Sequence, residues 1–194
     1  MSSFRSGLLV SAALFSLTAV RAAAQDVPVA RQISGAVLPL PDSLRAGAAV
    51  LGYRSGKLVQ LRAGTNAMIC LADDPSTERF QASCYHRSLE PFMVRGRALR
   101  AAGLERNAID SARLAEVKSG TLKMPDGPAA LYSVFAASDS LDPAAVDPAS
   151  LGRLYVIYLP FATEASTGIT TQPSRERPWL MHPGLPWAHV MIPK

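Results

Sequence analysis

The segment AMICLADDPSTERFQASCY, residues 67–85, contains two apolar runs with one cysteine in each. Between the runs, the sequence Asp-Asp-Pro-Ser at residues 73–76 is typical of a loop. We therefore predict two adjacent antiparallel strands joined by this loop. Cys70 and Cys84 are the two cysteines of the chain, and an even count in an oxidising compartment favours a disulfide, which would link these two strands.

After this segment, the spacing of the apolar residues changes to that of amphipathic helices. One helix is expected from Ser88 to Gly103 and a second from Asn107 to Gly120. Strand patterns are found at residues 48–53 and 57–62 before the segment, and at residues 130–135, 154–159, 179–181 and 188–192 after the helices. The turns between the early strands are too short for parallel crossovers. We therefore predict an α+β domain with a mainly antiparallel sheet covered by the two central helices.

Residues 26–41 carry Pro28, Pro39 and Pro41 and show no sustained helical period. Proline lacks a backbone donor and restricts the residue before it, so an extended segment is expected here. One short helical turn is expected at residues 42–47, where Gly47 would end it.

The N-terminus has the pattern of a cleavable export signal. Arg5 precedes an uninterrupted run of apolar and small residues at 7–20, and the three alanines at 22–24 suit a signal peptidase. The run would form about 21 Å of helix, which is too short for a hydrocarbon core of about 30 Å. We therefore expect residues 1–24 to be a signal peptide. Residues 25–194 are expected to form one globular domain, with no membrane span, in the periplasm or outside the cell.

Cleavage would remove Arg5 and Arg21 and no acidic residue, so the formal net charge would fall from +5 to +3. Five arginines lie close together in the helical region: Arg95, Arg97, Arg100, Arg106 and Arg113. Such a cluster can mark a nucleic-acid-binding face. In an exported protein of mild charge we instead expect a solvated helix surface and no nucleic-acid partner.

The densest polar cluster, at residues 84–90, lies at the expected junction of a strand and a helix. His86 and Glu90 could act as acid and base, or Cys84 could be a thiolate activated by an imidazole. A disulfide with Cys70 would exclude the thiolate. The alternative is that His86 and Glu90 organise the N-terminus of the helix, where a carboxylate favours the positive end of the dipole.

A second cluster lies near the C-terminus. In a strand, Trp187, His189 and Met191 would project to one face, because successive side chains point to opposite sides. Imidazole and thioether together form a soft ligand set, so His182, His189 and Met191 are candidates for a copper or zinc site. The alternative is that the methionine and tryptophan pack in the core and the histidines are satisfied there.

Two short stretches carry a resemblance to other proteins: GTNAMICLADDP at residues 64–75, followed by Cys84, and AHVMI at residues 188–192. They resemble a loose group of exported bacterial proteins with a Gly-Thr-Asn turn before a first cysteine and a His-aliphatic-Met sequence near the C-terminus. The resemblance implies no known activity. It makes Thr65, Asn66, His86 and His189 the first positions to test.

Sequence motifs for dinucleotide or phosphate binding, zinc proteases, haem attachment and serine hydrolases do not occur in the chain. We therefore expect a non-enzymatic domain that binds a small ligand or a protein partner, without a cofactor, in a cleft beside the sheet. Candidate ligand-binding residues are Thr65, Asn66, Tyr85 and Trp187. One alternative is a hydrolase-type enzyme with His86 and Glu90, or His189, as acid and base. The other is the soft-metal protein described above.

Overall fold

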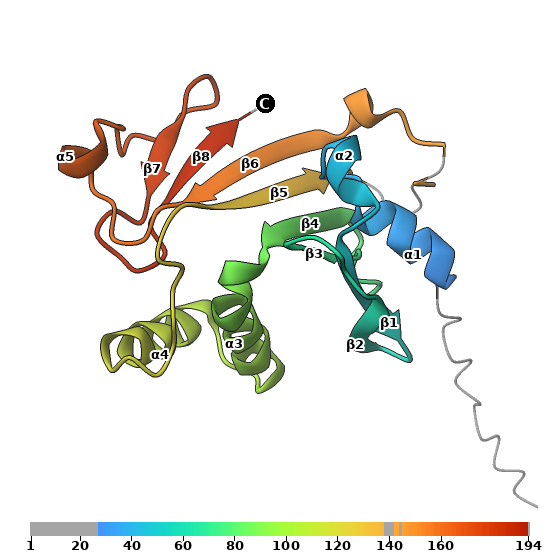
Figure 1. The fold of residues 1–194 in the computed structure, drawn as a ribbon, viewed down its shortest axis with the longest axis horizontal. Coiled ribbons are helices and arrows are strands. Elements are labelled where there is room, and N and C mark those ends of the chain that lie inside the picture. Colours follow the sequence, from blue (N-terminus) through green and yellow to red (C-terminus); the bar gives the residue numbers. More distant parts are fainter. Residues whose placement is uncertain (1–26, 138–141, 144, 194) are drawn as a thin grey trace, which may run out of the picture.

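The computed structural model describes residues 27–137, 142–143 and 145–193, in which eight strands form one sheet (Figure 1). The strands are β1 (Ala49–Arg54), β2 (Lys57–Arg62), β3 (Met68–Leu71), β4 (Gln81–His86), β5 (Ala129–Phe135), β6 (Gly152–Tyr158), β7 (Trp179–Met181) and β8 (His189–Pro193). Their order across the sheet is β2-β1-β3-β4-β5-β6-β8-β7, and every neighbouring pair is antiparallel except β1 and β3. The prediction of an α+β domain with a mainly antiparallel sheet is therefore confirmed.

The described helices include both that were expected in the centre of the chain. They are α1 (Val29–Ala36), α2 (Asp42–Arg45), α3 (Glu90–Ala101), α4 (Arg106–Lys118) and α5 (Glu164–Thr167), with the short 3-10 turns η1 (Arg87–Leu89) and η2 (Pro148–Ser150). The expected turn after Pro41 is α2. The helical region begins with η1, and the side chain of His86 caps this turn by accepting a hydrogen bond from the backbone N–H of Ser88.

The expectation of an extended segment at residues 26–41 is wrong, because α1 lies within it. Pro28 is the N-cap of α1, and the other two prolines follow its end, so they bound the helix without interrupting it. α1 packs against β1 and β4. Its buried Gln32 donates to the carbonyl of Tyr53 at 2.9 Å and accepts from the N–H of Tyr53 at 2.6 Å. Tertiary packing therefore stabilises a helix that the prolines concealed.

The parallel pairing of β1 with β3 is the second departure from the expected fold. Each turn between consecutive early strands is short, but the chain from β1 to β3 includes the whole of β2. This longer connection allows the parallel pair. Its last part crosses the start of β1, where the N–H groups of Thr65 and Asn66 donate to the carbonyl of Gly47 at 2.7 and 2.9 Å. Gly64 permits this crossing, because a Cβ there would lie 2.6 Å from the backbone nitrogen of Ala49.

A disulfide joins Cys70 to Cys84, as predicted. The two residues lie directly opposite each other in the antiparallel pair of β3 and β4, and both are fully buried. They pack in one cluster with Ala36 and Leu40. Disulfides are typical of proteins in oxidising compartments, so this bond suggests a periplasmic or extracellular location.

The two faces of the sheet meet different helices. α1 lies on the face that carries Cys70, whereas Leu89 and Met93, from η1 and α3, pack with Ile69 and Tyr85 on the opposite face. α3 and α4 also pack on each other, and Figure 1 shows them together on one side of the sheet. The structure does not confirm that these two helices cover the sheet.

No helix among the described residues is long and apolar enough to cross a membrane. The signal peptide predicted at residues 1–24 lies outside the part of the chain that the structure describes.

Candidate functional site

His86 lies where β4 ends and η1 begins. Its ring Nδ1 is 2.8 Å from the hydroxyl of Ser88 and 3.3 Å from the backbone nitrogen of the same residue. One ring nitrogen is thus engaged in capping the local turn. Glu90, the predicted partner of His86, binds other side chains, and no hydrogen bond joins the two within the described residues.

Glu90 belongs to a network of three side chains between β4 and α3. The hydroxyl of Tyr85 donates to Oε2 of Glu90, while Arg97 donates to Oε1 of Glu90 and to the oxygen of Tyr85, both at 2.9 Å. Tyr85 is only 2% exposed, and this burial, together with the hydrogen bond to Glu90, raises the pKa of its phenol. Charge-assisted hydrogen bonds therefore engage both oxygens of Glu90 and tie α3 to the sheet.

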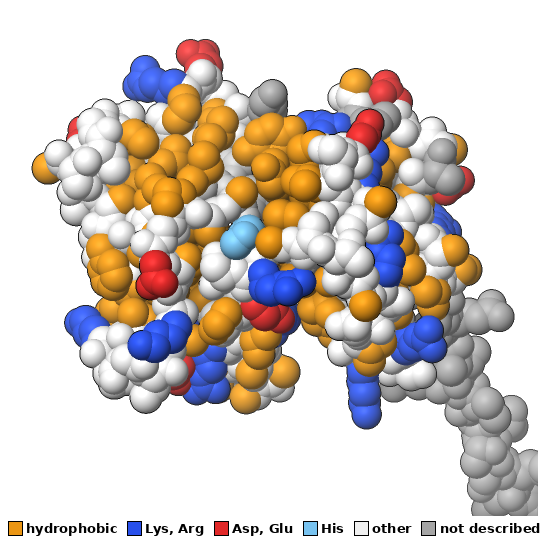
Figure 2. All heavy atoms as spheres, viewed as in Figure 1, with side chains coloured by type: hydrophobic (Ala, Val, Ile, Leu, Met, Phe, Trp, Pro, Cys, Tyr) orange, Lys and Arg blue, Asp and Glu red, His pale blue; other side chains and the backbone are white. Residues whose placement is uncertain are grey.

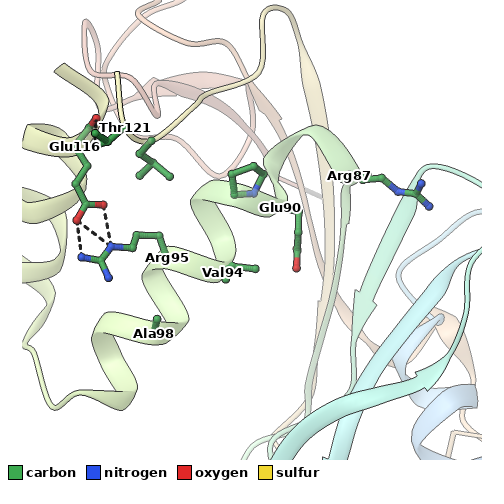
Figure 3. Close-up of a pocket in the computed structure, with 9 residues that line it drawn as sticks. Arg87, Glu90, Val94, Arg95, Ala98, Glu116 and Thr121 are labelled. Carbon is green, nitrogen blue, oxygen red and sulfur yellow. Dashed lines mark hydrogen bonds and ion pairs between the residues drawn. The ribbon is translucent and has the colours of Figure 1, made fainter. Parts of the chain in front are cut away.

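An open groove of about 780 Å³ lies between α3 and the C-terminal half of α4; we call it the α3–α4 groove (Figure 3). Its apolar lining residues are Pro91, Val94, Ala98 and Leu122, and its charged lining residues are Arg87, Glu90, Arg95 and Glu116. Arg95 points from α3 toward α4 and donates to both carboxylate oxygens of Glu116 at 2.5–2.9 Å. This bidentate ion pair joins the two helices that form the groove.

Aromatic and histidine side chains gather beside Phe92 of α3 and Arg113 of α4. We call Tyr158, His182, Trp187 and His189 the C-terminal cluster. The ring centroids of the two histidines are 5.7 Å apart, those of Tyr158 and His189 are 5.0 Å apart, and those of His182 and Trp187 are 6.4 Å apart. Nδ1 of His189 lies 2.8 Å from the carbonyl oxygen of Trp187. Burial lowers the pKa of His189; the bond to Trp187 opposes this change, and the nearby His182 adds to it.

Arg113 lies next to this cluster. It is one of the five arginines for which a solvated helix surface was expected. Its guanidinium carbon is 3.9 Å from the ring centroid of Phe92 and 5.7 Å from that of Trp187. Its side chain is only 15% exposed, and it forms an ion pair with Asp110 at 2.7 Å. The predicted solvated surface is therefore wrong for Arg113, because cation–π contacts hold its head group against aromatic rings. Gly96 leaves the space, since a Cβ there would lie 2.9 Å from Nη1 of Arg113.

Thr65 and Asn66, which the resemblance singled out, lie in the crossing between β2 and β3. The side chain of Asn66 donates to the carbonyl of Leu44 at 2.8 Å and accepts from the N–H of Met68 at 2.9 Å. Its backbone carbonyl accepts a hydrogen bond from Arg87, also at 2.9 Å. These bonds brace the crossing, and a role of the two residues in ligand binding stays a prediction.

The structure brings His182, Trp187 and His189 together, and the alternation of β8 places Met191 on the same face as His189. Met181, which was not among the candidate ligands, lies directly opposite His189 in the pairing of β7 with β8. A single sequence does not reveal the register of two strands, so this pairing could not be predicted from it. Within the described residues, no group of three or more His, Cys, Asp or Glu side chains is placed to hold a metal ion.

No protein-family model, curated protein or solved structure matches this chain. The function is therefore argued from the geometry of the α3–α4 groove and of the C-terminal cluster.

Proposed function

We propose that the chain is a non-enzymatic binding domain that holds a partner polypeptide in the α3–α4 groove. The observation that carries the proposal is the groove, whose apolar lining includes a Val94 side chain that is 45% exposed. In Figure 2, hydrophobic and charged side chains are interspersed over α3 and α4. Apolar surface bordered by charged groups is typical of interaction sites.

The open shape of the groove favours a polypeptide over a small ligand. Sites for small molecules bury most of the surface of the ligand, whereas this groove is open to solvent between two helices (Figure 3). A partner segment can place an apolar side chain against Val94 and Leu122. Its flanking polar groups can then meet the Arg95–Glu116 pair between the two helices.

Two networks hold the walls of the groove before a partner binds. The Arg95–Glu116 ion pair joins α3 to α4, and the bonds of Glu90 to Tyr85 and Arg97 join α3 to β4. A preformed site loses less conformational entropy on binding. The bonds of Glu90 to Tyr85 and Arg97 support a structural role for this residue, because they tie the start of α3 to the sheet.

A selection experiment tests the binding proposal. Peptides selected from a random-sequence library against the wild-type domain should share an apolar anchor residue, and their NMR shift changes should map to α3 and α4. Val94→Asp should weaken their binding at least about tenfold, or about 1.4 kcal/mol, because it places a charge in the apolar lining. Val27→Asp is the matched control, since Val27 is 36% exposed and does not line the groove.

Shift changes that map elsewhere, or equal binding by both valine variants, would contradict the proposal. Selection of no peptide, combined with tight binding of apolar fragments in the groove, would instead favour the small-ligand alternative.

Export is the second part of the proposal. Residues 1–24 carry the pattern of a signal peptide, and the buried disulfide supports an oxidising destination. Fusion of residues 1–30 to a reporter enzyme that is active only after export should give activity in a bacterial host. A fusion that begins at residue 25 should give none, and activity of the shorter fusion would contradict the assignment.

A further inference from the structure

The two histidines of the C-terminal cluster are separated by a distance that one metal ion can bridge. With a metal–nitrogen bond of about 2.0–2.1 Å, each ring centroid lies about 3.2 Å from the metal. Two imidazoles on one ion then have centroids about 5.2 Å apart at a tetrahedral angle and about 6.4 Å apart when they are collinear. The observed separation of His182 and His189 is 5.7 Å, which lies within this interval.

The hydrogen bonds of the rings leave nitrogens available for a ligand. Nδ1 of His189 donates to the carbonyl oxygen of Trp187, so the neutral ring carries its lone pair on Nε2. Such a bond to a backbone carbonyl is the usual outer support of a metal-binding histidine. No hydrogen-bond partner of Nε2 of His189, or of either ring nitrogen of His182, occurs among the described residues.

The backbone turns His182 toward His189. His182 directly follows β7, and its φ of 56° lies in the left-handed region, so its side chain departs from the alternation of the strand. The turn closes when the N–H of Leu185 donates to the carbonyl of His182 at 3.1 Å. The geometry of this turn thus brings a residue from the end of one strand beside the first residue of the next.

A thioether lies within reach of the same point. Met181 is directly opposite His189 in the antiparallel pair, and Cβ atoms of such residues are about 4.5–5.5 Å apart. The three rotatable bonds of methionine allow its sulfur to adapt to an ion between the two rings. Met191 shares the face of His189, but it lies two residues further along β8 and pairs with Trp179.

The surroundings favour a soft ion of low charge. Within the described residues no third histidine, cysteine or carboxylate joins this pair in a metal-binding group, which argues against calcium or a structural zinc site. Arg113 adds a positive charge beside Trp187. The rings of Tyr158 and Trp187 form an apolar wall that limits the access of water.

We propose that His182, His189 and Met181 form a binding site for a soft univalent cation, copper(I), at the junction of β7 and β8. Two imidazoles and one thioether match the ligand preference of copper(I). These three ligands would complete the site without a carboxylate. This inference is independent of the α3–α4 groove, which is lined by other residues.

Competition with a chromogenic copper(I) chelator tests the site, with ascorbate as reductant and silver(I) as a probe that does not change oxidation state. The wild-type domain should bind one equivalent of either ion. His182→Ala should weaken the affinity by more than about 100-fold, because loss of an outer-shell partner alone costs about 10–100-fold. Met181→Leu, which keeps the size of the side chain, should weaken it by about tenfold or more.

Two controls separate the site from general effects on the fold. His86→Ala removes the histidine at the end of β4 and Met191→Leu removes the neighbouring thioether, and both should bind the ions as wild type does. The thermal unfolding of each variant is measured without metal, so that a misfolded variant is recognised. X-ray absorption of the copper(I) form should show two nitrogen ligands and one sulfur ligand.

Several outcomes would overturn the proposal: failure of the wild-type domain to retain either ion against the chelator, equal loss of affinity in His86→Ala and His182→Ala, or an absorption spectrum without sulfur. Loss of affinity in Met191→Leu but not in Met181→Leu would contradict the assignment of the third ligand.

Discussion

His189 is the residue whose surroundings most clearly constrain its charge. It is held in the C-terminal cluster by ring contacts to Tyr158 and His182, and its Nδ1 donates to a backbone carbonyl. Burial lowers its pKa below the usual 6.5, so the folded protein favours the neutral ring. This neutral form is the one that leaves a lone pair on Nε2 for a ligand.

The lowered pKa of His189 makes the stability of the metal-free protein depend on pH. Above pH 6.5 the ring is neutral in both states, and its contribution to stability is fully present. As the pH falls below 6.5, the unfolded chain binds a proton that the folded chain resists, so the free energy of unfolding decreases. Urea denaturation at about pH 7.5 and about pH 5 should show a larger loss for wild type than for His189→Gln.

An NMR titration of the His189 ring measures the same effect directly. Its midpoint should lie below 6.5. A midpoint at or above this value, or equal losses of stability in wild type and His189→Gln, would show that burial does not control the charge of this residue.

At the scale of secondary structure, the crossing between β2 and β3 determines where β3 pairs. The chain passes the start of β1 at Gly64 and is bound there by the carbonyl of Gly47 and the side chain of Asn66. Only this passage places β3 beside β1 in a parallel pair, with the cysteine of β3 facing that of β4. The observed strand order therefore requires the backbone at Gly64 to pack closely against the start of β1.

Gly64→Ala should destabilise the protein for this reason. The new Cβ would lie 2.6 Å from the backbone nitrogen of Ala49, and a backbone atom cannot move aside as the end of a flexible side chain can. We expect a loss of about 1–3 kcal/mol in the free energy of unfolding, measured by urea denaturation, as is typical of overpacking.

Gly127→Ala is the matched control for this substitution, because nothing lies within 4 Å of its added Cβ. It should leave the free energy of unfolding within about 0.5 kcal/mol of wild type, as is usual for a surface change. Equal effects of the two substitutions would mean that the crossing tolerates a side chain at residue 64.

For the whole molecule, the disulfide is a covalent link at the centre of one core cluster. It joins two of the inner strands of the sheet, and its sulfur atoms are buried beneath α1. The link restricts the unfolded chain over the intervening loop, so its effect extends to the stability of the whole fold.

The double substitution Cys70→Ala/Cys84→Ala should lower the free energy of unfolding by about 3 kcal/mol, the entropy expected for a loop of this size. Urea denaturation of the wild-type and double-variant domains measures the difference. A reductant should lower the urea midpoint of wild type and leave that of the double variant unchanged. A double variant as stable as wild type would show that noncovalent packing alone sustains the fold.

Local patterns in the sequence were sufficient for most elements. Alternating or continuous apolar runs predicted the strands, and helical spacing with terminal glycines predicted α3 and α4, because these signals depend on neighbours a few residues away. The pairing of Cys70 with Cys84 followed from their positions in two strands joined by one loop. α1 was missed, since three prolines around it outweighed an amphipathic pattern that only burial against β1 makes stable.

The sequence by itself thus determined the α+β class, the mainly antiparallel sheet and the disulfide, because each depends on short-range order along the chain. Only the tertiary structure decided the parallel pair of β1 and β3, the burial of Arg113 on Phe92, and the partners of Glu90. It also brought Met181 opposite His189 and placed His182 beside that ring. These contacts join residues from separate elements, and strand register and helix docking, which the packing of the whole core sets, determine which of them meet.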